Sequence, residues 1–123
     1  MTVIETNNAP AAIGPYSQAM TANGLVYTSG QIPIDPKTGI IEAEGIEAQT
    51  EQVIKNLAAV LKAAGSGLDR VVKTTCFLKS IGDFAVFNEV YAKSFTGKPA
   101  RSCVEVSELP KGALVEIEVI AEA

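Results

Sequence analysis

The chain has no histidine, no tryptophan and only two cysteines, Cys76 and Cys103, among its 123 residues. Without histidine it cannot form a Ser-His or Cys-His catalytic pair, and it cannot supply an imidazole ligand to zinc or iron. Two cysteines are too few for a disulfide framework or for a four-cysteine metal site in one chain. Any chemistry must therefore rest on carboxylates, Tyr, Arg, Lys, Cys and backbone groups.

Signals for membranes and for export are also missing. No apolar run is long enough to span a bilayer. Residues 1–12 contain neither the basic region nor the long apolar stretch of a secretory signal. We therefore expect a cytoplasmic protein with reduced thiols and no membrane partner.

The chain has little positive charge: its net charge is −4, and it contains no cluster of Lys and Arg. A polyanion would be repelled on average, so we expect no nucleic-acid partner. The G-x-x-x-x-G-K-S/T loop, the G-x-G-x-x-G turn and the G-x-S-x-G elbow are absent as well. The usual signs of a nucleotide cofactor and of a serine hydrolase are therefore missing.

What is present is ordinary globular composition, with 47% hydrophobic and 20% charged residues. This length predicts a single domain over residues 1–123 with a real core. Alternating or β-rich runs predict strands at 16–21, 25–28, 71–78, 100–106 and 115–121, and helical periodicity predicts helices over 46–64 and 84–95. The order β-β-α-β-α-β-β predicts an α+β fold, a mixed sheet with both helices packed on one face.

The opposite face of that sheet is expected to be mixed in character. Alternation along the last two strands assigns Arg101, Cys103, Glu116 and Glu118 to it, together with the apolar Ile120. Such a face is often a subunit interface in a symmetric oligomer. If strands 100–106 and 115–121 form a simple hairpin, Glu118 lies opposite Cys103, and Glu116 is displaced from Arg101.

Each polar candidate has a plain alternative when it is considered alone. Arg101 could form an ordinary surface ion pair, or it could clamp an anion, because its planar guanidinium matches a carboxylate at two points. Glu116 and Glu118 could be solvated strand residues, or one of them could orient a water or move a proton.

The remaining candidates are open in the same way. Tyr16 could be a packed aromatic or a hydroxyl at a cleft rim. Ser29 and Gly30 could form a turn or bring the backbone close to a ligand, and Asn88 could be merely solvated. The Cys103 thiol has no histidine to activate it, so its backbone N–H is the better ligand donor.

The candidate residues lie in longer stretches of sequence, and these stretches together are more informative than any residue alone. Residues 9–19 (APAAIGPYSQA), 24–33 (GLVYTSGQIP), 100–106 (ARSCVEV), 109–110 (LP) and 115–118 (VEIE) closely resemble the RidA (YjgF) family of reactive-intermediate deaminases. The resemblance runs over essentially the whole chain, in order and with the expected spacing. The one visible departure is a short connection between Asn88 and Arg101.

The resemblance implies a chorismate-mutase-like α+β fold assembled as a homotrimer, with the three sheets facing inward and three clefts between neighbouring subunits. It implies hydrolysis of 2-imino acids, such as 2-iminobutanoate and 2-iminopropanoate, to 2-keto acids and ammonia. These imines form from the enamines that pyridoxal-phosphate dehydratases release. No cofactor and no metal are implied.

The resemblance also implies roles for single residues. Arg101 would hold the substrate carboxylate, the backbone N–H of Cys103 would contact the other polar end, and Glu116 would activate the attacking water. Glu118 is not the family's catalytic carboxylate. Tyr16 would line the cleft with its hydroxyl. Three further positions would complete the binding site, namely Ser29 and Gly30 in its wall and Asn88 on its helix.

Two other functions stay open. The first is a regulatory trimer that binds a small carboxylate at the same pocket without turnover. The second is a ribonuclease or translation inhibitor, which the acidic balance and the lack of histidine disfavour.

Overall fold

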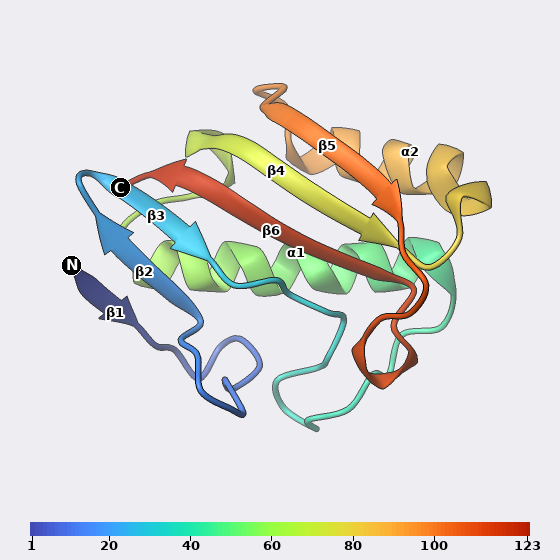
Figure 1. Ribbon diagram of the computed structural model, residues 1–123, viewed down its shortest axis with the longest axis horizontal. Helices are drawn as coiled ribbons and strands as arrows, with labels where there is room; N and C mark the ends of the chain where they lie inside the picture. Colours follow the sequence, from blue (N-terminus) through green and yellow to red (C-terminus); the bar gives the residue numbers. More distant parts are fainter.

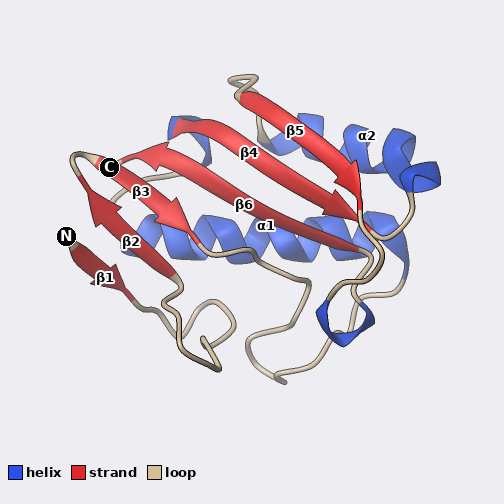
Figure 2. Ribbon diagram, viewed as in Figure 1, coloured by secondary structure: helices blue, strands red, loops and turns tan.

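The computed structural model describes residues 1–123 as one six-stranded mixed sheet with two long helices on one of its faces (Figure 1). The strands are β1 (Thr2–Ile4), β2 (Ala19–Ala22), β3 (Leu25–Thr28), β4 (Val71–Leu78), β5 (Ala100–Glu105) and β6 (Val115–Glu122). The helices are α1 (Gly45–Ala63) and α2 (Phe84–Ser94), and 3-10 turns cover Leu68–Arg70, Ile81–Asp83 and Pro110–Gly112. The predicted α+β fold with a mixed sheet and two helices on one side is confirmed (Figure 2).

The strands lie in the order β1-β2-β3-β6-β4-β5. All neighbours are antiparallel except β4 and β5, which are parallel. A parallel pair needs a long crossover, and α2 supplies it. The hairpin considered for strands 100–106 and 115–121 is therefore wrong, because β4 lies between β5 and β6.

The core forms where the apolar stripes of the helices meet the sheet. Alternate residues of β6 are buried, namely Val115, Ile117, Val119 and Ala121. They pack in one cluster with Leu57 and Leu61 of α1 and with Phe87 of α2. The period of two along β6 and the helical period along α1 and α2 thus converge on one apolar layer. Neither α1 nor α2 combines the length and the apolar character that a membrane-spanning helix requires.

The N-terminal part departs from prediction in two ways. The short edge strand β1 was not predicted, since three residues are too few to show a period. The strand expected from residue 16 begins only at Ala19. Tyr16 lies in the preceding loop, where its N–H donates to the carbonyl oxygen of Gly14 at 2.9 Å.

The orientation of β5 also differs from prediction. Arg101 pairs with Thr74 of β4, and Cys103 pairs with Cys76; both β4 residues are buried beneath the helices. Arg101 and Cys103 therefore lie on the helix-covered face, while Glu116, Glu118 and Ile120 lie on the open face, as expected for them. Alternation within a strand does not show which set of residues faces the helices; the register with β4 does.

Candidate active site

The carboxylate of Glu116 lies in a hollow of about 630 Å³ that also contains Tyr16, Ser29 and Gly30. The structure thus brings four of the predicted site residues together. Much of the remaining wall is apolar, with Pro10, Ala11, Ile13, Ile32 and Ile34. A hollow of this size, with an apolar wall and a few polar groups, can bind a small molecule with a short aliphatic side chain.

Backbone pairing brings residues 29–31 against the start of β6. Gln31 and Ile117 exchange both backbone hydrogen bonds, at 2.9 and 3.1 Å. Ser29 is fixed as well, because its N–H donates to the carbonyl of Gln18 at 2.9 Å and its hydroxyl to that of Ser17 at 2.5 Å.

Gly30 allows the close approach of this segment to the carboxylate. A Cβ at this position would overlap the Glu116 side chain, lying only 2.8 Å from its Cδ. Glycine is therefore needed at position 30 because the Glu116 carboxylate occupies the space beside it. A sequence pattern alone does not show this contact.

The environment of Glu116 favours its protonated form. Burial raises the pKa of the Glu116 carboxyl above its usual range, and the charge of Glu118 raises that pKa further. A carboxylate with a raised pKa is a stronger base than an ordinary glutamate, which suits a group that takes a proton from water.

Arg101 is held by α2 on the other side of the sheet. Its Nη1 donates to Oδ1 of Asn88 at 2.7 Å, and its guanidinium carbon lies 4.8 Å from the ring centroid of Tyr91 and 5.4 Å from that of Phe84. Its only side-chain hydrogen bond is thus to a neutral amide. The other guanidinium N–H groups are free to bind an anion at two points.

The two cysteines lie side by side on β4 and β5 but are poor nucleophiles. Burial raises the pKa of the Cys76 thiol to about 12 and also raises the pKa of Cys103. The backbone of Cys103 is more available. The N–H of Val106 donates to Leu78 of β4, and amide directions alternate along a strand, so the N–H of Cys103 points to the free edge of the sheet.

One chain does not bring all the predicted residues together. Arg101 and Asn88 line a separate hollow of about 520 Å³, on the opposite face of the sheet from Glu116. Sequence reasoning missed the two aromatic partners of Arg101, Phe84 and Tyr91. Phe84, Asn88 and Tyr91 are four and three residues apart and so lie on one face of the helix, and this spacing could have identified the two aromatic residues as neighbours of the site.

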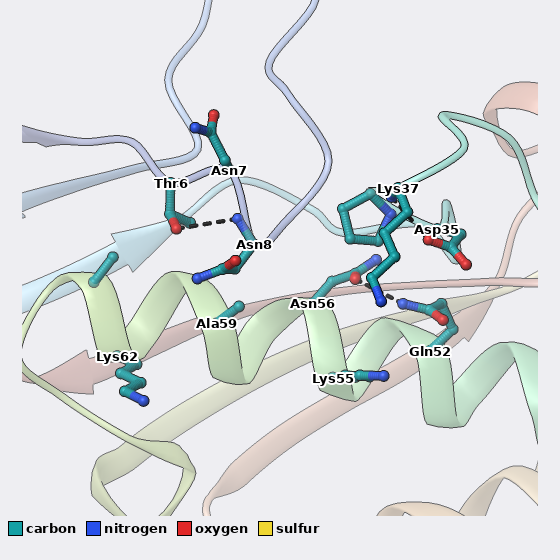
Figure 3. A pocket seen from close by; sticks show the side chains of 12 residues that line it. Thr6, Asn7, Asn8, Asp35, Lys37, Gln52, Lys55, Asn56, Ala59 and Lys62 are labelled. Atoms are coloured by element: carbon teal, nitrogen blue, oxygen red, sulfur yellow. Dashed lines mark hydrogen bonds between the residues drawn. The ribbon is translucent and has the colours of Figure 1, made fainter.

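A third hollow, of about 700 Å³, contains none of the predicted residues. It lies between α1 and the loops around residues 7 and 36, with Lys37, Lys55 and Lys62 at its rim (Figure 3). Its floor is the side chain of Asn56, which donates to the carbonyls of Ile32 and Ile34 and accepts from Gln52. These bonds satisfy the buried amide, so a structural role explains it.

The sequence matches a family model described as Endoribonuclease L-PSP over residues 6–123. It is 58% identical, over 99% of this chain and 98% of the relative, to the candidate regulator AldR of Lactococcus lactis. It is 52% identical, over 96% and 94% of the two chains, to the 2-iminobutanoate/2-iminopropanoate deaminase of Salmonella typhimurium.

Among solved structures, E. coli TdcF with bound serine superposes with a TM-score of 0.94 at 42% identity, over 100% of this chain and 99% of that one. The family model and these relatives extend over nearly the whole chain. The protein therefore belongs to the RidA/YjgF family, the family of the Endoribonuclease L-PSP model.

Proposed function

We propose that this protein hydrolyses 2-imino acids to 2-keto acids and ammonia. The observation that carries the proposal is the pair of half-sites: a carboxylate with a raised pKa in a partly apolar hollow, and an arginine whose hydrogen-bonding partner is neutral. A 2-imino acid has the complementary parts, a carboxylate and an electrophilic carbon beside a short side chain. The deaminase name of the Salmonella relative and the serine bound to TdcF support a small substrate of this kind.

In this mechanism Arg101 binds the substrate carboxylate through two parallel hydrogen bonds, and the N–H of Cys103 contacts its other polar end. Glu116 takes a proton from water as the new C–O bond forms at the imine carbon, and the C=N π pair moves to nitrogen. Glu116 then gives that proton to the nitrogen, and its carboxylate accepts the proton of the new hydroxyl group as the carbonyl forms. The C–N bond breaks, and ammonia leaves and takes up the remaining proton as ammonium. Positioning is the main requirement, since a protonated imine is already electrophilic.

We also propose that the cleft lies between two subunits of a homotrimer. Arg101, Asn88 and Cys103 would come from one subunit, and Glu116, Tyr16, Ser29 and Gly30 from its neighbour. The separation of the two sets within one chain supports this arrangement, because neither set can complete the site alone.

The open face of the sheet supports the same assembly. Strand register places Val3, Met20, Tyr27 and Ile120 side by side in one row across β1, β2, β3 and β6 on that face. Val3 is 58% exposed and Tyr27 43% exposed in the single chain. A continuous apolar row on a sheet is a surface that a second copy can bury.

The test is a coupled assay in which an amino-acid oxidase or a threonine dehydratase generates the imine and its decay is followed. We expect wild type to accelerate the decay and Arg101→Ala to lose the acceleration. No acceleration by a folded wild-type protein, across several imino acids, would contradict the proposal.

A second candidate is a regulatory trimer that binds a small carboxylate without turnover, and the name of the Lactococcus relative favours it. It predicts saturable binding of a 2-keto acid with no effect on imine decay. A ribonuclease activity, suggested by the name of the family model, predicts RNA binding that weakens steeply with salt, which the net charge of −4 disfavours.

A further inference from the structure

Arg101 is surrounded by one face of α2. Phe84, Asn88 and Tyr91 are separated by four and three residues, so they project from the same side of the helix. Two aromatic rings lie within 4.8 and 5.4 Å of the guanidinium carbon, and the amide oxygen of Asn88 lies 2.7 Å from Nη1. A guanidinium beside aromatic faces and tied at one nitrogen has few orientations left.

Tyr91 is itself firmly held. Its hydroxyl is hydrogen-bonded to Oγ1 of Thr74 at 2.8 Å. Its ring stacks on that of Phe95, with the two ring centroids 4.4 Å apart, and the ring centroid of Phe87 lies 5.6 Å from its own. The side chain is only 7% exposed.

Thr74 links Tyr91 back to Arg101, because Thr74 is the residue paired with Arg101 across β4 and β5. The backbone pairing of Thr74 with Arg101, the hydrogen bond of Thr74 to Tyr91 and the stacking of Tyr91 on Arg101 thus form a closed triangle. Its three corners belong to β4, α2 and β5.

We propose that Tyr91 is a positioning residue for carboxylate binding: its ring, anchored through Thr74, fixes the plane in which the Arg101 guanidinium meets the substrate. This inference rests on the proposed function of Arg101 as the carboxylate clamp. The hydroxyl of Tyr91 is engaged by Thr74, so Tyr91 acts through Arg101 and makes no contact with the reacting atoms.

The energetics favour a measurable effect. A free arginine side chain has many rotamers, and two parallel hydrogen bonds to a carboxylate require one of them. Loss of the ring face should weaken carboxylate binding about fivefold to thirtyfold, the range that a partly desolvated cation–π contact covers. The carboxylate is bound in both the ground state and the transition state, so the loss should appear in KM more than in kcat.

The experiment compares wild type, Tyr91→Leu, Tyr91→Phe and the control Phe87→Leu. Phe87 lies on the same helix, is fully buried and contacts the Tyr91 ring, so its substitution loosens the same packing without removing the ring face from Arg101. Each protein is assayed with an imino acid and with the matching imino carboxamide, which lacks the charge that Arg101 binds.

For Tyr91→Leu we expect KM for the imino acid to rise about tenfold with kcat within about threefold, and no change with the carboxamide. Tyr91→Phe keeps the ring and should recover most of the affinity. An unchanged KM in Tyr91→Leu would overturn the proposal. So would an equal loss with the carboxamide, or an equal loss in Phe87→Leu.

A second readout does not depend on turnover. The Nε–Hε resonance of Arg101 in a 15N NMR spectrum should be sharp in wild type and broadened in Tyr91→Leu, and titration with 2-oxobutanoate should show weaker binding by the variant. If wild type hydrolyses no imine, the proposed function is wrong, yet this spectrum still decides the role of Tyr91. Identical Arg101 resonances and identical 2-oxobutanoate affinities in the two proteins would contradict it.

Discussion

Glu116 is the residue whose surroundings matter most for the proposed chemistry. Burial and the neighbouring charge of Glu118 both disfavour its ionised form, and Gly30 leaves just enough room for the carboxylate. The group must nevertheless be ionised to accept a proton from water. Activity and stability should therefore respond to its ionisation in opposite directions.

For activity, we expect Glu116→Gln to lower kcat by about 10²–10⁴-fold, the usual contribution of a general base. In wild type, kcat should fall as the pH decreases through the raised pKa of Glu116. Steady-state rates across the pH range check this expectation. A variant with full activity, or a wild-type rate that does not decline at acidic pH, would remove Glu116 from the mechanism.

For stability, ionisation of Glu116 is unfavourable, which is the reverse of its effect on activity. A carboxyl whose pKa is raised by folding destabilises the fold once it ionises, and this penalty grows as the pH rises from the usual carboxyl range through the raised pKa. Glu116→Gln should therefore increase Tm near neutral pH, and the difference should vanish near about pH 3, where carboxyls are protonated. Thermal melts at both pH values measure it, with Glu122→Gln, at an exposed site of the same strand, as the matched control. A lower Tm for Glu116→Gln at neutral pH would mean that its charge stabilises the fold.

Gly30→Ala tests the close approach of the backbone. The added methyl would lie 2.8 Å from Cδ of Glu116, so the carboxylate must move. A displacement near 1 Å at a catalytic group can cost about 10²-fold in rate, and we expect a loss of that order in kcat/KM with the fold intact by circular dichroism. Gly97→Ala is the control, since a Cβ there meets nothing within 4 Å and the φ of Gly97, like that of Gly30, is not positive. Unchanged kcat/KM in Gly30→Ala would show that the contact is irrelevant to catalysis.

At the scale of elements, the loop before β2 depends on one buried amide. Gln18 is 3% exposed, accepts from the N–H of Thr6 at 2.7 Å and donates to the carbonyls of Thr6 and Pro10 at 3.0 and 2.8 Å. It thus fixes the segment that contributes Pro10, Ala11 and Tyr16 to the hollow around Glu116.

Gln18→Met keeps the shape of the side chain but leaves these groups without partners. We expect a loss of about 1–3 kcal/mol in the free energy of unfolding, the usual penalty for buried unsatisfied groups, together with a higher KM. Urea denaturation gives the first value and steady-state kinetics the second. Gln52→Met, which removes one hydrogen bond at a half-buried site, should cost less. Equal losses in the two variants would argue against the anchoring role of Gln18.

The long periodic elements could be predicted from sequence, and their arrangement in space could not. The stripe of α1 and the alternation in β6 are local patterns, so both elements appear where expected. The parallel pairing of β4 with β5 depends on the crossover through α2, which no local pattern reveals. For that reason Arg101 was identified as a candidate but assigned to the wrong face of the sheet. Tyr91 was recognised only as an apolar helix residue, because its contact with Arg101 is tertiary.

At the scale of the whole molecule, a single chain holds the two proposed half-sites on opposite faces of one sheet. Arg101 and Asn88 line one hollow, and Glu116 with Tyr16 and Gly30 lines another. The open face carries an apolar row in which Val3 and Tyr27 are exposed in the single chain. An assembly that buries this row and joins the half-sites of neighbouring subunits would account for both features.

Subunit complementation tests this shared cleft most directly. Arg101→Ala and Glu116→Gln are co-expressed with different tags, and mixed oligomers are purified through both tags. Each variant alone should be nearly inactive. In each mixed trimer one cleft of the three, about a third of all clefts, combines an intact Arg101 from one subunit with an intact Glu116 from its neighbour. We predict that about a third of the wild-type imine hydrolysis returns; mixed oligomers as inactive as their parents would show that no cleft is shared between subunits.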